Sequence, residues 1–181
     1  MGPIAYNLCH KEVIGVAMWI TGLCSFPPLI TPTDVSLQEP GVVLRKDFNA
    51  PLDKSYLLSL RFVFPSTEAR LKDELVGDGR HSKYCKGDVE YESIPLNERQ
   101  GLGLPIPLKV AVRKQPEGTL VIEQTFQSLC KTFHATNDKG RSVGRINLKE
   151  GAYRIEVSNQ LAQPAFKDLK VEISLVSGDA K

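Results

Sequence analysis

The stretch Tyr56–Phe64 (YLLSLRFVF) decides the fold, because its side chains alternate between two faces. One face carries Ser59 and Arg61 together with two aliphatic residues, so it is partly polar. A period of two residues with one apolar face is typical of a half-buried β-strand. The apolar face holds five large side chains: Tyr56, Leu58, Leu60, Phe62 and Phe64.

The same period of two residues returns along the chain and predicts seven or eight strands. The other predicted strands are Gly41–Phe48 and segments near 108–112, 120–126, 143–148, 153–157 and 169–175. Strands with one apolar face bury it best between two packed sheets. We therefore predict an all-β fold, an immunoglobulin-like or related two-sheet antiparallel β-sandwich with one short helix.

The short helix is expected directly after Pro65, which ends the central strand. Ser66 or Thr67 can cap its first turn, and the helix should run to about Val76 with Leu71 among its apolar contacts. A second local signal is Tyr153, which follows Gly151 at the start of a late strand. This arrangement is typical of a tyrosine corner, in which the phenol bonds to an upstream backbone group. A tyrosine that only packs in the core is the alternative.

The segment Val13–Cys24 (VIGVAMWITGLC) has the layout of an export signal. It is an uncharged, mostly apolar run after a polar start, and it is shorter than the roughly 20 residues that a membrane-spanning helix needs. We predict a signal or lipoprotein-signal segment over 1–24, a Pro-rich tether over 25–40 and one β-sandwich domain over 41–177. Cys24 is the predicted point of lipidation or processing, and an uncleaved N-terminal helix is the alternative.

Charge gives little instruction about a partner. The 181 residues have a formal net charge of +2, and Lys and Arg are interspersed with acids. No basic stripe indicates nucleic acid.

The pair Cys85 and Cys130 lies in the predicted domain, and in an exported protein such a pair is most simply a disulfide. It would contribute on the order of 3–4 kcal/mol to stability. Free thiols are one alternative. A zinc site is another, because His81 lies four residues from Cys85 and His134 lies four residues from Cys130, and two sulfurs with two imidazoles suit tetrahedral zinc.

Catalytic motifs are missing from the sequence: it has no nucleophile elbow, zinc-protease motif, phosphate loop or dinucleotide fingerprint. We therefore expect no enzyme and no cofactor. The long irregular stretch 77–106 is the candidate binding loop, with Tyr84, Asp88, Glu90, Tyr91 and Glu92 as its candidate residues. Its three acids alternate, so in an extended chain they would share one face. Such a row suits calcium, paired glycosidase carboxylates or simple solvation.

Several weak patterns together resemble an uncharacterised bacterial family of exported, often lipid-anchored β-sandwich domains, named only as a domain of unknown function. The resemblance covers about residues 35–176 and implies a fold and a location but no catalytic residues. It rests on Val35–Gly41, Phe48 through Tyr56 to Phe64, Leu75–Asp78, Pro105–Val110, Leu148–Ile155 and Phe166–Ile173.

The leading hypothesis is a non-enzymatic binding domain of the bacterial cell envelope, periplasmic or held at the membrane by a lipid on Cys24. It would bind another protein through one sheet face or through the 77–106 loop. A narrower version is an immunity-type protein that neutralises a toxin in the periplasm. The alternatives are a module for cell-envelope carbohydrate and a hydrolase that uses the loop carboxylates or the cysteine–histidine pairs.

Overall fold

The computed structural model of the chain describes residue 17 and residues 26–78, 83–86 and 89–177. Within these residues, no helix is long and apolar enough to span a membrane. Cys24, His81 and Asp88 lie outside the described residues.

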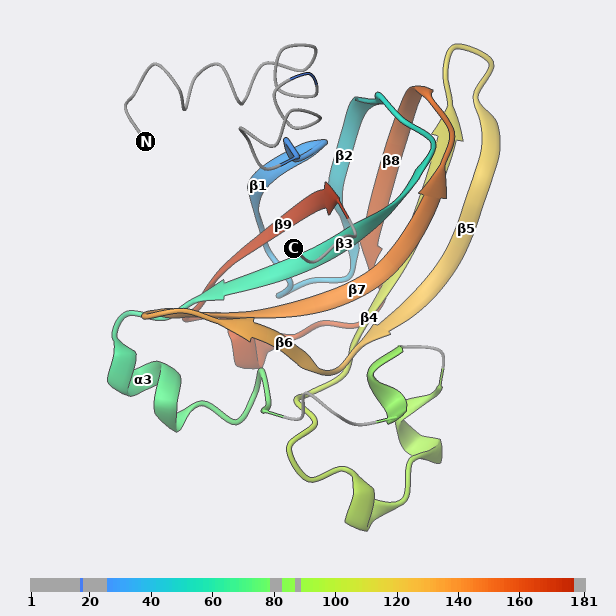
Figure 1. Ribbon diagram of the computed structural model, residues 1–181. Coiled ribbons are helices and arrows are strands. Elements are labelled where there is room, and N and C mark those ends of the chain that lie inside the picture. The colour runs from blue at the N-terminus through green and yellow to red at the C-terminus, as the bar shows by residue number, and fades with distance from the viewer. Residues whose placement is uncertain (1–16, 18–25, 79–82, 87–88, 178–181) are drawn as a thin grey trace, which may run out of the picture.

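Two antiparallel sheets face each other (Figure 1). The five-stranded sheet has the order β1(Ile30–Val35), β9(Lys170–Ser177), β3(Lys54–Val63), β7(Asp138–Leu148) and β6(Lys131–His134). The four-stranded sheet has the order β2(Gly41–Ala50), β8(Gly151–Asn159), β4(Ile106–Lys114) and β5(Thr119–Ser128). All the strand pairs are antiparallel. The predicted two-sheet β-sandwich with one short helix is confirmed.

The core lies between the sheets, where β3 supplies the alternating face that the sequence predicts. The β3 side chains Tyr56, Leu58, Leu60 and Phe62 are at most 1% exposed. On the four-stranded sheet, β4 and β8 contribute buried aliphatic side chains to the same core: Val110, Val112, Ile155 and Val157. Burying one such side chain contributes about 1.5–3 kcal/mol before the entropy cost. The layers therefore hold together by apolar burial.

Residues 30–35, predicted as part of the tether, instead form the edge strand β1. The strand pairs with β9, and Ile30 is buried in the core. Pro32 argues against a strand in the sequence because proline lacks a backbone N–H. An edge strand tolerates it, since one side of the strand needs no hydrogen-bond donor. The domain therefore begins before residue 41.

The helix α3(Thr67–Lys72) is capped as expected but ends early. The Ala69 N–H donates to the Ser66 hydroxyl at 3.1 Å. Beyond Lys72 the Asp73 carboxylate accepts the N–H groups of residues 75 and 76 in place of further helical turns. The predicted contact of Leu71 is wrong, since this side chain is 68% exposed.

Short helical turns punctuate the irregular stretch 77–106 and the chain before β9. They are η1(Lys83–Lys86), η2(Tyr91–Ser93), η3(Leu96–Glu98) and η4(Pro164–Phe166). Figure 1 shows the segment that carries η1–η3 beyond the end of the sandwich where β4, β5 and β6 meet. The 77–106 stretch is therefore an ordered insertion at one end of the fold in its described parts.

Two tyrosines bond back to the chain four residues upstream. The Tyr153 hydroxyl donates to the Lys149 carbonyl at 2.9 Å, as the tyrosine-corner interpretation predicts. The Tyr56 hydroxyl donates to the Leu52 carbonyl at 3.0 Å in the same way. Each bond fixes the entry into a central strand.

We predict that Tyr153→Phe lowers the free energy of unfolding by about 1 kcal/mol, because a mostly buried hydrogen bond is lost without a cavity. Chemical denaturation measures this change. The matched control is Tyr84→Phe, whose hydroxyl bonds the Glu98 carboxylate, where we expect less than about 0.5 kcal/mol because that carboxylate is partly solvated. Equal effects at the two positions would contradict the corner's structural role.

Candidate functional site

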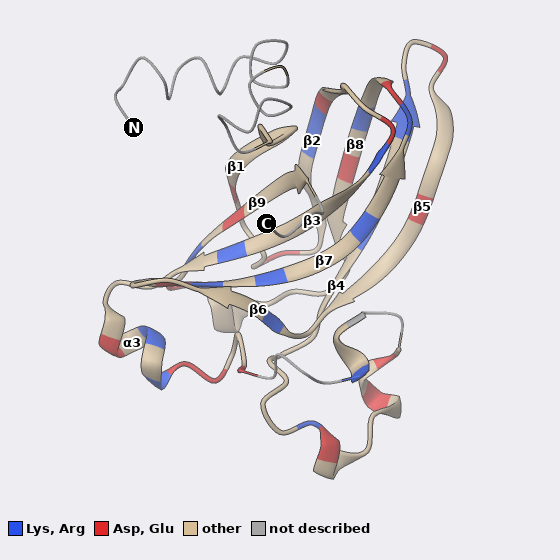
Figure 2. Cartoon of the chain, viewed as in Figure 1, with Lys and Arg blue, Asp and Glu red and all other residues tan. Residues whose placement is uncertain are grey.

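A charged depression lies on the outer face of the four-stranded sheet. Alternation along β2, β8, β4 and β5 turns polar side chains outward, and Figure 2 shows basic and acidic positions interspersed on β2 and β8. Ala111, on β4, leaves room among longer neighbours. The resulting hollow of about 440 Å³ is lined by Arg45, Lys109, Ala111, Arg113, Glu123, Arg154, Glu156, Ser158 and Gln160.

Cross-strand ion pairs order this face. Arg45 pairs with Glu156 at 2.6 Å, Arg154 with Asp47 at 2.6 Å, and Lys109 with Glu123 at 3.0 Å. The hydrogen bond from Arg154 lowers the pKa of Asp47 below its usual value. Exposed pairs of this kind contribute little to stability. Their main effect is to fix the positions of the side chains.

Arg113 has no acidic partner among the described residues. It lies opposite Arg154 in the β4–β8 register, and its guanidinium donates only to the Gly118 carbonyl, at 3.3 Å. Like charges directly opposite each other are unfavourable in a sheet. The depression therefore presents one surplus guanidinium to solvent.

A second hollow of about 270 Å³ continues from the first toward the irregular stretch. The two share Gln160, and we call them together the groove. Leu161 at this end is 60% exposed. The second hollow is lined by Tyr91, Glu92, Pro105, Pro107, Thr125, Gln127, Gln160 and Leu161.

Arg99 holds the loop end of the groove in shape. Its guanidinium donates to the carbonyls of Ile94 and Glu92 at 2.8 and 2.9 Å. It also lies 4.7 Å from the centre of the Tyr91 ring, a cation–π distance. Tyr91 is thus fixed by its neighbours and has one ring face covered.

A disulfide ties the irregular stretch to the chain between β5 and β6. Cys85 and Cys130 are joined, with Cα atoms 5.3 Å apart, as the sequence predicts. Around the bond lies a small second core of Ile94, Leu102 and Leu129. The sulfurs are therefore not available as zinc ligands in this structure, and no group suited to a metal ion occurs within the described part of the chain.

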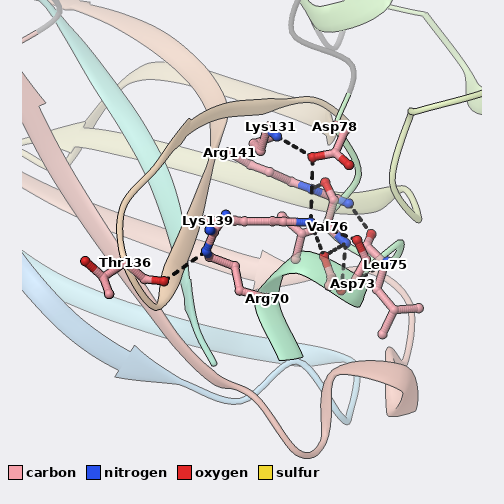
Figure 3. Close-up of polar contacts among 9 residues, drawn as sticks. All are labelled: Arg70, Asp73, Leu75, Val76, Asp78, Lys131, Thr136, Lys139 and Arg141. Carbon is pink, nitrogen blue, oxygen red and sulfur yellow. Dashed lines mark hydrogen bonds and ion pairs between the residues drawn. The ribbon is translucent and has the colours of Figure 1, made fainter. Parts of the chain in front are cut away.

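The base of the loop is held by a buried guanidinium. Arg141, on β7, is 0% exposed and donates to four backbone carbonyls. Figure 3 shows the bonds to Leu75 and Val76. Burial lowers the pKa of Arg141 to about 9, which leaves it protonated at neutral pH. The accepting carbonyls are those of Leu75 at 2.5 Å, Val76 at 3.0 Å, Leu104 at 2.6 Å and Ser128 at 2.8 Å.

Gly103 makes this arrangement fit. A Cβ atom at this position would overlap the Arg141 guanidinium and the backbone of residues 75 and 76. Gly77 contacts the same backbone segment, because it forms an antiparallel β-bridge with Leu102. The Asp78 N–H next to it donates to the Gly101 carbonyl at 2.8 Å. The two ends of the irregular stretch are therefore clamped together over one cation.

We predict that Arg141→Met lowers the free energy of unfolding by at least about 3 kcal/mol, because the change removes every side-chain donor from four carbonyls at a mostly buried site. Denaturant unfolding measures the loss. The control is Arg145→Met, four residues further along β7 at an exposed position. It should lower the free energy of unfolding by less than about 0.5 kcal/mol. Equal losses would show that Arg141 is not the clamp.

We also predict that Cys85→Ser/Cys130→Ser lowers the free energy of unfolding by about 4 kcal/mol, because the unfolded chain regains the freedom of a loop of about 45 residues. Dithiothreitol should destabilise the wild-type protein by a similar amount and leave the double variant unchanged. A reductant effect that persists in the variant would argue against this bond as its cause.

The predicted loop residues are divided by the structure. Tyr91 and Glu92 line the groove, whereas Tyr84 donates to the Glu98 carboxylate at 2.9 Å and belongs to the second core. Glu90 precedes η2 and uses its carbonyl to hold Ser93. The interpretation of an alternating acidic face is wrong for Glu90 and Glu92, because residues 91–93 form a helical turn.

Apart from Tyr91 and Glu92, sequence reasoning missed the residues that line the groove, Arg113, Gln160 and Leu161 among them. Arg113 is an exposed residue of β4, whereas Gln160 and Leu161 directly follow β8, and the pairing of β4 with β8 places them along one groove. The available signal was weak: Gln160 and Leu161 directly follow β8 and come shortly before Pro164.

Comparisons with known proteins give a family and a fold. A family model described as a domain of unknown function (DUF5625) matches residues 31–177. A crystal structure of a protein from Sulfurospirillum deleyianum has a TM-score of 0.63 with this chain at 18% identity, covering 84% of this chain and 99% of the other. A search of curated proteins finds no match. At this identity the structural likeness shows the fold alone.

Proposed function

The chain belongs to the DUF5625 family, a domain of unknown function, and we propose that it is a non-enzymatic binding domain that holds a protein partner in the groove. The supporting observation is that one continuous surface joins the outer sheet face to the disulfide-tied loop through Gln160. A scaffold of fixed strands that presents an ordered loop is a common way to build a binding site.

The chemistry of the groove favours a protein as partner. Its sheet end alternates cations and carboxylates, and its loop end offers Tyr91, two proline rings and the exposed Leu161. Protein interfaces combine such apolar and aromatic anchors with a polar rim. The surplus guanidinium of Arg113 favours a partner that places a carboxylate there.

Carbohydrate is less well supported as the ligand. Thr125, Gln127 and Gln160 could hydrogen-bond sugar hydroxyls, but the Tyr91 ring already has Arg99 against one face. A sugar ring could stack only on the other face of Tyr91, and no tryptophan lines the groove, so the aromatic surface available to a sugar is small.

The disulfide supports a location outside the cytoplasm. Bonds of this kind persist in oxidising compartments and are rare where thioredoxin and glutathione keep thiols reduced. Together with the leader-like residues 13–24, it supports our proposal that the domain works in the cell envelope, free or held by a lipid on Cys24. Neutralisation of an incoming toxin is a narrower form of the same proposal.

The test is capture of a partner by purified, immobilised full-length protein from an envelope extract of the source organism. We predict that Arg113→Glu and Leu161→Ser each reduce the retained partner at least tenfold, because central interface side chains contribute about 1–2 kcal/mol or more. The matched controls are Lys167→Glu and Leu71→Ser, at exposed positions outside the groove, and they should retain the wild-type amount.

Equal capture by all four variants would exclude the groove as the site. Binding of a purified cell-wall polymer that Tyr91→Ala abolishes would instead favour the carbohydrate interpretation. Far-ultraviolet circular dichroism of each variant shows that a lost interaction is not lost folding.

A further inference from the structure

We propose that Lys131 and Lys139 form a binding site for a small oxyanion, a phosphate or carboxylate group, and that the exposed carboxylate of Asp78 occupies this site as an internal ligand. The site lies at the base of the irregular stretch (Figure 3). It is separate from the groove, whose lining residues it does not include.

The two ammonium groups are built into the fold. Lys139, on β7, has a side chain only 2% exposed, and its Nζ donates to the Asp73 carboxylate and carbonyl, both at 2.8 Å. Lys131, on β6, has a side chain 11% exposed and pairs with Asp78 Oδ1. Long cationic side chains are seldom this buried unless they are paired. These lysines are therefore positioned groups and not ordinary surface charges.

The two carboxylates at the site differ in their access to solvent. The Asp73 side chain is 5% exposed and lies inside, against Lys139. The Asp78 side chain is 65% exposed, yet its Oδ1 contacts Lys131 and lies 3.8 Å from the Nζ of Lys139. One oxygen of a largely exposed side chain thus sits where two mostly buried cations converge, which is the position that one oxygen of an external anion would take.

The charge balance favours an anion here. Three cations meet at the base of the loop, Lys131, Lys139 and Arg141, whereas Asp73 and Asp78 supply two negative charges. Arg141 is compensated by carbonyl dipoles and makes no direct contact with a carboxylate. If Asp78 moves away, Lys131 and Lys139 keep only the Asp73 carboxylate. Because an unbalanced charge at low solvent exposure is costly, an external anion would replace the charge that Asp78 removes.

The ionisation of Asp78 agrees with this geometry. The hydrogen bond from Lys131 holds the pKa of Asp78 below its usual value, and the charges of Lys139, Lys131 and His134 add to the effect. His134, at the end of β6, is close enough for its charge to act on Asp78. Arg70 on α3 donates to the carbonyl of Thr136, two residues after His134.

An internal ligand lowers the affinity for an external one, since Asp78 must first move away. A tethered group acts at a high effective concentration, and the apparent affinity falls by the fraction of molecules in which the site is vacant. Removing the Asp78 charge while keeping its size should therefore reveal the site.

The experiment titrates full-length protein with inorganic phosphate by isothermal calorimetry, with KCl holding the ionic strength constant. We predict that Asp78→Asn binds phosphate at least tenfold more tightly than the wild-type protein and that Asp78→Asn/Lys131→Met loses this gain. Asp168→Asn, an exposed aspartate away from the site, is the charge-matched control and should behave as the wild type. A parallel titration with acetate shows whether carboxylate or phosphate is preferred.

A phosphate affinity equal to that of Asp168→Asn in both Asp78→Asn and Asp78→Ala would overturn the proposal, as would full retention of the gain in the double variant. Asp78→Ala is the second variant, because an asparagine amide oxygen could still accept from Lys131 and keep the site filled. Unfolding curves without phosphate establish that each variant is folded. The result is independent of partner capture by the groove.

Discussion

The guanidinium of Arg141, surrounded by backbone carbonyls, is the interaction on which the functional end of this fold depends. The sandwich itself is held by apolar burial, but apolar side chains cannot hydrogen-bond the backbone carbonyls of an irregular segment. Four carbonyls from three separate segments converge where β7 passes under the loop. A planar guanidinium with five N–H donors can hydrogen-bond all four carbonyls at once. The arginine thus joins the β-sheet to an insertion that has little regular structure of its own.

The groove follows from that clamp. The irregular stretch leaves the sandwich near residue 76 and returns near residue 104, and Arg141 and Gly103 hold these two points together. The disulfide then fixes the middle of the stretch to the β5–β6 connection. With both restraints in place, η2 presents Tyr91 and Glu92 beside the end of the four-stranded sheet. A loop of this length without such restraints would lose binding energy to ordering on contact with a partner.

The sequence predicts the strands where the core is apolar and fails where the inward face is charged. Alternation identifies β3, β4 and β8 because every second residue is hydrophobic. The sequence predicts a strand only near 143–148, yet β7 begins at Asp138, because Lys139 and Arg141 take inward positions beside Phe62 and Leu60 in the register. Buried cations are tolerated there only because carbonyls and Asp73 pair with them. That pairing depends on distant segments, which a period in the sequence does not contain.

The candidate site shows the same division between local and distant information. A long loop with exposed polar residues can be recognised as a candidate from composition, and Tyr91 and Glu92 were found in this way. Arg113 and Gln160 become part of one site only through the pairing of β4 with β8, two strands that are far apart in the sequence.

The buried charges also explain why this end of the fold has one definite geometry. An apolar plug would bury comparable area in several arrangements, because dispersion contacts have little directionality. Hydrogen bonds from Arg141 and Lys139 are directional, and each broken bond at this mostly buried site costs free energy. Lys139, which holds Asp73 inside, also lies 3.8 Å from the exposed Asp78, and Lys131 pairs with Asp78. Structural pairing and a site open to an external anion therefore arise from one set of side chains.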